Sequence, residues 1–276
     1  MRYSIVLSAC VSLLSISVWG QRVTTLQISG LNGPNGFAIN SKGVLFVANE
    51  PGKKVMKVAP GGRAEVVIEC DSPGGLDFDD QDNLYISNFF SGTILKWKNG
   101  RLDTLAKGLS QPADLKSDRN GNVFVAEYNT GKIKKIDKQK HITDFASGFN
   151  LPFGLEVDSQ SNLYVANNTT GVINRIDRSG VLTVFATIPG SISFMAFSEK
   201  SGVLYVPCFS CHGVFIVSST GAVELLAGKG TAGDQDGLLA EAAFNGPNSV
   251  AISKDGILYV SEFPVNRIRK ITGIEP

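Results

Sequence analysis

One short apolar pattern occurs six times along this chain, at nearly regular intervals. Two of its copies are Leu45-Phe-Val-Ala-Asn49 and Leu163-Tyr-Val-Ala-Asn167. The copies begin at Leu45, Leu84, Val123, Leu163, Leu204 and Leu258. Successive starts are 39, 39, 40, 41 and 54 residues apart. A period near forty residues with strand-forming content is typical of a β-propeller. We therefore predict an all-β fold, a six-bladed β-propeller.

Each repeat contains enough residues for four strands. The copies named above are apolar on both faces, which suits a strand held between neighbouring blades. A later segment of each repeat alternates polar and apolar residues, as in Lys132-Ile-Lys-Lys-Ile136, and suits a strand nearer to water. Turns such as Asp118-Arg-Asn-Gly-Asn122 connect successive strands. The repeat therefore predicts four-stranded antiparallel blades.

The two ends of the chain supply parts of one blade. The last repeat stops after its third strand, at Thr272, and Val23-Thr-Thr-Leu-Gln-Ile28 resembles the fourth strands of the other repeats. Pairing these ends would leave no large open sheet edge. We predict one domain over residues 21–276, closed by the N-terminal strand completing the last blade.

Residues 1–20 have the pattern of a secretory signal peptide. Arg2 precedes an apolar run, and small residues lie near the expected cleavage before Gln21. The run is too short for a membrane anchor, so we expect a secreted or periplasmic protein without a membrane span.

The charge balance argues against nucleic-acid binding. The chain has 26 basic and 25 acidic residues, and loss of Arg2 with the leader brings the net charge to zero. Binding to phosphates needs a basic excess. We expect a monomer whose partner is a small molecule or a protein.

The segment from Gly230 to Ile252, with Arg267-Ile-Arg-Lys-Ile271, resembles an NHL-repeat blade. The shared features are a Gly-rich lead-in, an Asp-Gly pair and Phe244-Asn-Gly-Pro247. The wider relatives are the gluconolactonase / senescence marker protein / strictosidine synthase-like group and virginiamycin B lyase, all propeller enzymes. Because the scaffold also serves binding proteins, the resemblance leaves activity open.

The lactonase-like relatives hold a divalent metal above the channel with Glu, Asn and Asp. The resemblance implies Asn35 and Asn248 as matching residues, on adjacent blades, but no carboxylate occupies the other matching positions. Glu262, Glu127 or Asp114 would have to complete a site for a divalent cation such as calcium, which prefers anionic oxygen ligands. The alternative, which we favour, is that both asparagines cap turns.

The lyase-like relatives use a histidine, and neither His141 nor His212 matches that position.

The last residues of the second strands form a predicted ring. Its members are Asn49, Asn88, Glu127, Asn167, Cys208 and Glu262. Aromatic residues lie close by: Phe89, Phe90, Tyr128, Phe209 and Phe263, with Phe37 and Phe153. Together they predict an aromatic, polar-studded entrance able to hold an apolar molecule or peptide. The alternative is structural: the ring bonds loop backbone, and the aromatic rings wedge between blades.

Cys208-Phe-Ser-Cys211-His212 has the spelling of a c-type haem attachment site. A local disulfide or a pair of buried thiols is the alternative that we favour, because the segment is a tight turn between strands.

The leading functional hypothesis from the sequence is ligand binding at one face of the channel. A metal-dependent lactone or ester hydrolase is the second hypothesis, and a haem redox protein is the third.

Overall fold

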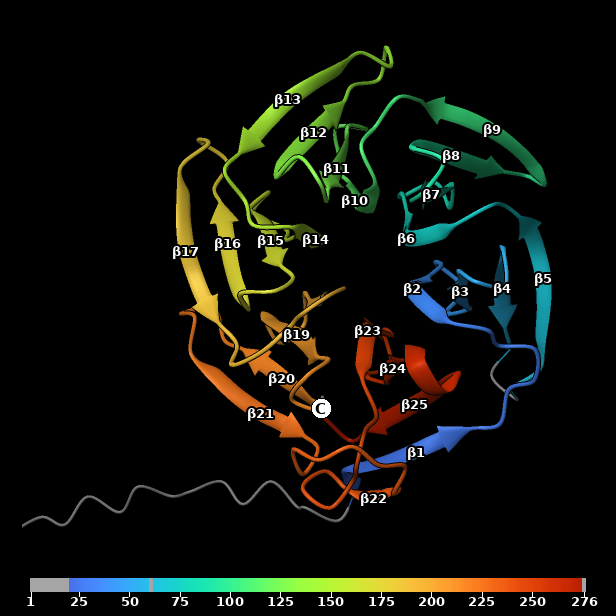
Figure 1. The fold of residues 1–276 in the computed structure, drawn as a ribbon, viewed down its shortest axis with the longest axis vertical. Coiled ribbons are helices and arrows are strands. Elements are labelled where there is room, and N and C mark those ends of the chain that lie inside the picture. Colours follow the sequence, from blue (N-terminus) through green and yellow to red (C-terminus); the bar gives the residue numbers. More distant parts are fainter. Residues whose placement is uncertain (1–19, 60–61, 275–276) are drawn as a thin grey trace, which may run out of the picture.

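Six β-sheets stand around a central axis like the blades of a propeller (Figure 1). The structure is a computed structural model that describes residues 20–59 and 62–274. The predicted signal peptide, apart from Gly20, lies outside the described residues. The predicted all-β, six-bladed fold is confirmed.

Blades 1 to 3 each contain four antiparallel strands, numbered outward from the axis. Blade 1 comprises β2 (Pro34–Ile39), β3 (Leu45–Asn49), β4 (Lys54–Val58) and β5 (Ala64–Glu69). Blade 2 comprises β6 (Pro73–Phe78), β7 (Leu84–Asn88), β8 (Thr93–Lys98) and β9 (Arg101–Ala106). Blade 3 comprises β10 (Pro112–Ser117), β11 (Val123–Glu127), β12 (Lys132–Ile136) and β13 (Ile142–Ser147).

Blades 4 and 5 continue this order, and blade 6 closes the circle. Blade 4 comprises β14 (Pro152–Val157), β15 (Leu163–Asn167), β16 (Val172–Ile176) and β17 (Leu182–Thr187). Blade 5 comprises β18 (Ala196–Ser198), β19 (Val203–Cys208), β20 (Gly213–Val217) and β21 (Val223–Ala227). Blade 6 comprises β23 (Pro247–Ile252), β24 (Leu258–Glu262), β25 (Arg267–Thr272), β1 (Arg22–Leu26) and β22 (Gly237–Leu238). The short 3-10 helix η2 (Phe263–Val265) follows β24.

The N-terminal strand closes the propeller as predicted. β1 pairs antiparallel with β25, from Arg22 opposite Thr272 to Leu26 opposite Ile268. Figure 1 shows the first strand, in blue, beside the last strand, in red. Blade 6 departs from the four-stranded prediction, because β22 pairs with the outer side of β1. This fifth strand comes from the extra residues of the last, 54-residue interval.

A buried arginine holds this closure together. Arg269 on β25 has no exposed surface and donates to Asp236 at 2.7 Å and to the Ala243 carbonyl at 2.7 Å. Asp236 also accepts from the backbone and hydroxyl of Thr25 at 3.0 and 2.9 Å. One carboxylate therefore joins the N-terminal strand, the C-terminal strand and the long connection between blades 5 and 6.

The hydrophobic core lies between the blades. All five residues are buried in each of β3, β7, β11 and β15. Six apolar clusters each join two adjacent blades; the cluster of Phe46 and Leu76, for example, joins blades 1 and 2. Burial on both faces explains why the second strands read as continuous apolar runs. Within residues 20–59 and 62–274, no helix is long and apolar enough to cross a bilayer.

Candidate functional site at the two ends of the central channel

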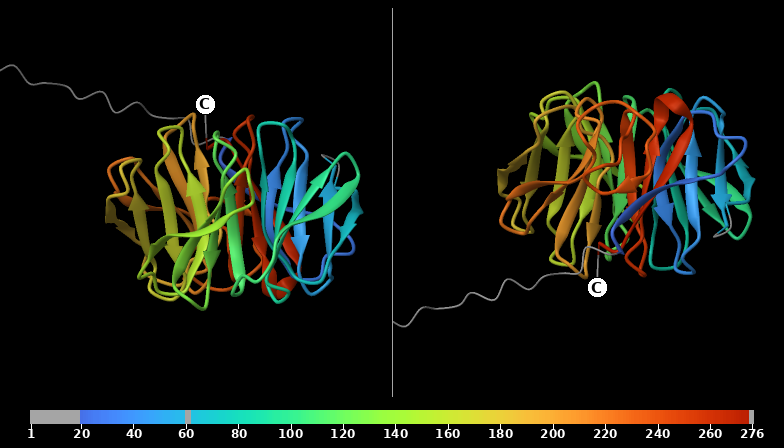
Figure 2. Two further views of the ribbon diagram at one scale, coloured as in Figure 1. Left: turned by 90° about the horizontal axis from the view of Figure 1, so that it is seen from above. Right: turned by 90° about the horizontal axis from the view of Figure 1, so that it is seen from below.

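The innermost strands run from one face of the propeller to the other. Figure 2 shows the blades edge-on, with strands spanning the thickness of the disc. Each innermost strand begins at the face that carries the second-strand ends, since Pro34 lies opposite Asn49 and Pro112 opposite Glu127. The channel therefore has one end built by the starts of these strands and another built by their ends.

A row of aromatic rings crosses the first of these ends. We call this end the aromatic face and the row Phe90, Phe89, Tyr128, Phe153 and Phe194 the aromatic row. Neighbouring ring centroids in this order are 5.1, 5.9, 5.7 and 5.0 Å apart, in tilted or edge-to-face arrangements. Such spacings are typical of favourable aromatic contacts. The row therefore connects blades 2, 3, 4 and 5.

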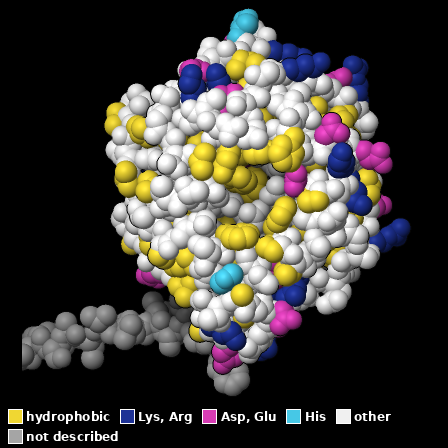
Figure 3. Space-filling model, viewed as in Figure 1, with side chains coloured by type: hydrophobic (Ala, Val, Ile, Leu, Met, Phe, Trp, Pro, Cys, Tyr) yellow, Lys and Arg dark blue, Asp and Glu magenta, His cyan; other side chains and the backbone are white. Residues whose placement is uncertain are grey.

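The aromatic row passes from solvent to the interior. Phe90 is 72% exposed, whereas Phe194 is only 3% exposed. Phe89, Tyr128 and Phe153 have intermediate burial, and Phe209 nearby in the sequence of blade 5 is 37% exposed. Figure 3 views the face that carries η2 and shows hydrophobic side chains around its central hollow, with charged groups mainly toward the edge. The exposed ring of Phe90 is therefore linked through successive ring contacts to the buried ring of Phe194.

Two other predicted aromatic residues lie differently. Phe263 is half-buried in η2, and its ring lies 3.0 Å from where a Cβ at Gly33 would stand. Of the two alternatives for Phe37, a place at the entrance or a position wedged between blades, the structure has the second. A register shift separates Pro34 from Phe37, and the Phe37 side chain packs between blades 1 and 6.

The predicted polar ring accepts hydrogen bonds from loop backbone. Four of the five accepting side chains bond an N–H 17 residues earlier, and the fifth bonds one 16 residues earlier. The pairs are Asn49 with Asn32, Asn88 with Ser72, Glu127 with Ser110, Asn167 with Asn150 and Glu262 with Asn245. These contacts fix the loops that enter each blade. A ligand-binding role for the ring residues stays a prediction.

Asn35 and Asn248 meet across blades 1 and 6. The Asn248 amide donates to Asn35 Oδ1 at 2.7 Å. The carboxylates that would complete a metal site face elsewhere: Glu262 lies 3.5 Å from Arg269 Nη1, and Asp114 accepts from the backbone of Leu115 and Leu155. Among the described residues, no three His, Cys, Asp or Glu side chains are grouped to hold a metal ion. The donor set therefore does not fit the lactonase-like metal site.

Cys208 and Cys211 form a disulfide, with their Cα atoms 5.2 Å apart. Haem attachment would require both of these sulfur atoms as thioethers, so the predicted haem site does not fit this arrangement. His212 Nδ1 accepts from the Gly246 backbone at 3.3 Å. Of the alternatives for this motif, the structure contains the local disulfide.

The opposite end of the channel is charged, a feature that was not predicted from the sequence. One residue of each innermost strand, at the equivalent position, lines this end. These six residues are Ala38, Asp77, Lys116, Glu156, Ala196 and Ala251. The three charged members lie on consecutive blades 2, 3 and 4. We call this end the charged end.

Lys116 forms ion pairs with the blades on both sides. Its Nζ lies 2.9 Å from Glu156 Oε1 and 3.8 Å from Asp77 Oδ1. Asp77 Oδ2 also accepts from the Ser117 backbone at 2.8 Å and from its hydroxyl at 2.6 Å. The Asp77, Lys116 and Glu156 side chains are only 14–17% exposed.

Burial shifts the pKa of every carboxyl in this cluster upward. Desolvation raises the pKa of Asp114 to about 6 and the pKa of Glu156 to about 7, against the opposing effect of Lys116. Desolvation also raises the pKa of Asp77. Desolvation lowers the pKa of Lys116, but the neighbouring carboxylates, with Glu156 the strongest of them, together raise it above its ordinary value. Lys116 is therefore protonated at neutral pH.

A cavity of about 150 Å³ opens beside these charges. Its wall includes the six residues named above together with Phe37, Phe78 and Phe197, among others. The signal in the sequence was a charged residue in three innermost strands at the position where the other three have alanine. That signal depends on an exact alignment of the strands, which the structure supplies.

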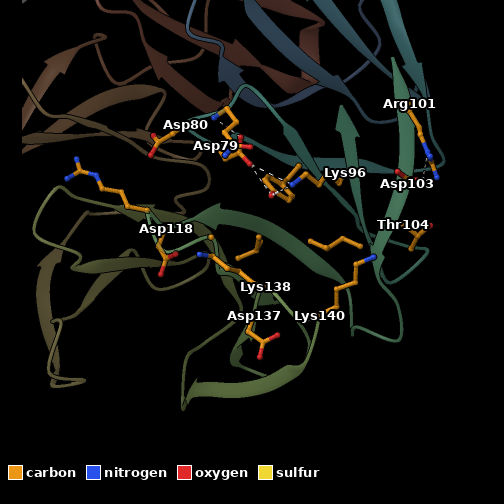
Figure 4. A pocket seen from close by; sticks show the side chains of 16 residues that line it. Asp79, Asp80, Lys96, Arg101, Asp103, Thr104, Asp118, Asp137, Lys138 and Lys140 are labelled. Atoms are coloured by element: carbon orange, nitrogen blue, oxygen red, sulfur yellow. Dashed lines mark hydrogen bonds and ion pairs between the residues drawn. The ribbon is translucent and has the colours of Figure 1, made fainter. Parts of the chain in front are cut away.

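A larger cleft, of about 620 Å³, lies between blades 2 and 3, away from the channel. Figure 4 shows its lining, with Asp79 and Lys96 from blade 2 opposite Lys138 and Lys140 from blade 3. Charges of both signs alternate here, and Lys96 lies 3.8 Å from Asp79 and 2.6 Å from the Tyr85 hydroxyl. Because its charges largely compensate each other, the cleft carries weaker evidence of a ligand than the channel ends.

The fold is similar to several solved propeller structures. A gluconolactonase from Xanthomonas campestris aligns with a TM-score of 0.74 and 17% identity, over 91% of this chain and 89% of that one. Virginiamycin B lyase from Staphylococcus aureus aligns with a TM-score of 0.68 and 16% identity, over 93% and 87%. An auxiliary nutrient binding protein from Bacteroides thetaiotaomicron aligns with a TM-score of 0.79 and 15% identity, over 91% and 76%.

Sequence comparison adds no closer relative. No protein-family model matches the chain, and no curated protein matches it. The assignment to NHL repeats therefore stays a prediction. The solved structures show that the chain shares its six-bladed propeller fold with gluconolactonase-like and virginiamycin B lyase-like proteins.

Proposed function

We propose that this protein binds a neutral ligand with at least one planar ring, a small molecule or an aromatic side chain of a partner, on the aromatic face. The aromatic row carries the proposal. Its outer member, Phe90, is 72% exposed, and its inner members are held by contacts with neighbouring rings. Rings that are fixed before binding lose little conformational entropy when a ligand stacks on them.

The polarity of the face supports a neutral ligand. The ring carboxylates Glu127 and Glu262 accept backbone hydrogen bonds and are buried. They do not supply free charge to the entrance. Apolar contact with a few fixed polar groups is typical of small-molecule sites.

The hydrolase hypothesis has weaker support. Asn35 and Asn248 bond each other, and the carboxylates that would join them hold loops or arginine. The neighbouring structures include two enzymes and a nutrient binding protein, so the scaffold accommodates both classes. The disulfide favours an oxidising compartment, which supports export to the periplasm or the cell exterior.

Titration with N-phenyl-1-naphthylamine, a neutral aromatic dye whose fluorescence rises in apolar surroundings, tests the proposal. We expect saturable binding to the purified protein. The double variant Phe90→Ala/Tyr128→Ala should bind about 10-fold or more weakly, because each lost aromatic contact is worth about 1 kcal/mol.

Phe145→Ala is the matched control, because Phe145 is 38% exposed but lies on the outer strand β13. It should leave dye binding unchanged. Equal losses in both variants would show that the dye binds nonspecifically to exposed rings. Unchanged binding in the double variant, with the protein folded, would contradict the proposal.

A further inference from the structure

The charged end has a shortage of positive charge. Two carboxyl groups, Asp77 and Glu156, share the single ammonium group of Lys116, and the buried Asp114 carboxyl lies near enough to raise the pKa of that ammonium group further. The other three innermost strands, β2, β18 and β23, contribute alanines and apolar residues to this cavity. Uncompensated charge in such a setting is costly unless a counter-charge or a proton arrives.

The same cavity has room for an apolar group. Ala38, Ala196 and Ala251 stand where larger side chains would extend into the channel, and Phe78 and Phe197 lie at the wall. A cavity of about 150 Å³ is comparable to one that holds benzene. The space therefore suits a compact ligand of roughly six to eight non-hydrogen atoms.

We propose that the charged end binds a compact organic ammonium ion, with its cationic group beside Asp77 and Glu156 and its carbon skeleton against the three alanines. The ligand would add positive charge on the side of the charged end that carries the carboxylates, and it would fill the space on the side that carries the alanines. This site is separate from the aromatic face and does not depend on the function proposed there.

The chemistry of the cluster favours an ammonium ion over two other uses. Lys116 already forms ion pairs with both Asp77 and Glu156, so these carboxylates are not free to coordinate one metal ion together, whereas an ammonium ion needs a bond to only one of them. Lys116 itself is held protonated by its neighbours, so it is not a free amine nucleophile. Binding of a cation by Asp77 and Glu156 requires no change in the protonation state of Lys116.

Protons compete with the ligand for the same carboxylates. Glu156 has a pKa of about 7 and Asp114 one of about 6, so both groups lose protons as the pH rises from 5 to 8. Lys116 keeps its charge through this range. Binding of an ammonium ion should therefore strengthen with increasing pH.

Isothermal titration with cyclohexylammonium, and with neutral cyclohexanol as its isostere, tests this inference on the purified protein. We expect saturable binding of the amine at pH 8, at least tenfold weaker binding at pH 5, and at least tenfold weaker binding of cyclohexanol at pH 8. Calcium chloride alone is the third probe, and tighter binding of calcium than of the amine would overturn the proposal.

Glu156→Gln keeps the shape of the side chain and should weaken amine binding at least tenfold. Glu199→Gln is the matched control, an exposed carboxylate in the turn after the innermost strand of blade 5, and should change nothing. Ala251→Leu fills the cavity without altering charge and should also abolish binding while the protein remains folded by circular dichroism.

Equal amine affinity in Glu156→Gln and Glu199→Gln would overturn the proposal, as would equal binding of amine and alcohol. If Ala251→Leu fails to fold, the Glu156 comparison still decides. Retention of amine binding by Phe90→Ala/Tyr128→Ala distinguishes this site from the aromatic face.

Discussion

The two ends of the channel use the same repeated strands in different ways. At the aromatic face, five of the six blades end the second strand with Asn or Glu, and all five side chains accept a loop N–H. At the charged end, the equivalent positions differ from blade to blade, as alanine, aspartate, lysine or glutamate. Where repeats agree, the residue stabilises the common scaffold. Where they disagree, the residue makes one sector of the channel distinct.

The ends also differ in how their distinctive residues are held. Phe90 is largely in solvent, whereas Lys116 is mostly buried between carboxylates of two neighbouring blades. Substitution of Phe90 should therefore act on binding with little effect on stability. Substitutions at the charged end should act on stability as well, because they leave charges unpaired inside the protein.

The largest effect is expected for Lys116→Met, which removes the ammonium group between the carboxylates. We expect a loss of about 3–5 kcal/mol in the free energy of unfolding at pH 8. The loss should be smaller at pH 5, because the carboxyl groups then take up protons. Urea denaturation at both pH values measures this difference.

Lys138→Met is the control for this prediction, since Lys138 is exposed. It should change the free energy of unfolding by less than about 0.5 kcal/mol. A Lys116→Met variant as stable as this control at pH 8 would show that the two ends of the channel do not differ in the way described.

An intermediate effect is expected from the titration of Glu156. Its pKa is raised from 4.5 to about 7 in the folded protein, so the folded state holds the proton more tightly than the unfolded state. Protonated Glu156 therefore stabilises the folded state. This contribution to the free energy of unfolding is fully present below pH 4.5, and roughly 3 kcal/mol of it is lost as the pH rises to about 7.

Glu156→Gln should remove this component of the pH dependence. Urea denaturation of the wild type and the variant at pH 4.5, 5.5, 6.5 and 7.5 compares the two slopes. We expect the wild type to lose stability relative to the variant as the pH rises. Parallel curves would contradict the assignment of a raised pKa to Glu156.

The smallest effect on stability is expected for Phe90→Ala. Because the ring is 72% exposed, its loss should change the free energy of unfolding by less than about 0.5 kcal/mol. Phe194→Ala, at the buried end of the same aromatic row, should cost about 3–5 kcal/mol. Thermal or urea denaturation of the two variants shows where the row changes from binding surface to core.

The scaffold could be predicted closely from local patterns. The period of the apolar second strands indicated six blades, and the resemblance of residues 23–28 to the fourth strands indicated the closure with β25. Hairpin turns followed from Asp118-Arg-Asn-Gly-Asn122 and its counterparts, where Asp118 accepts from Asn122 at 2.8 Å. Such features depend on neighbours in sequence, which is why a single chain reveals them.

The site residues were harder to predict because they depend on contacts between blades. Asp77, Lys116 and Glu156 are about forty residues apart in sequence, and nothing local distinguishes them from solvated charges on a strand. Whether Phe37 faced the entrance or packed between blades was also left open by the sequence, and its contacts with blade 6 decide it. The fifth strand of blade 6 was missed because β22 has only two residues.

The sequence by itself determined the number of blades, the strand that closes them and the burial of the second strands, since periodicity and alternation encode each of these directly. Only the tertiary structure decided which side chains meet across the channel. It joined Asn35 to Asn248, placed Lys116 between Asp77 and Glu156 and aligned five rings into one row. The physical reason is that burial and partner choice arise where separate repeats pack together, and one-residue shifts in strand register change both.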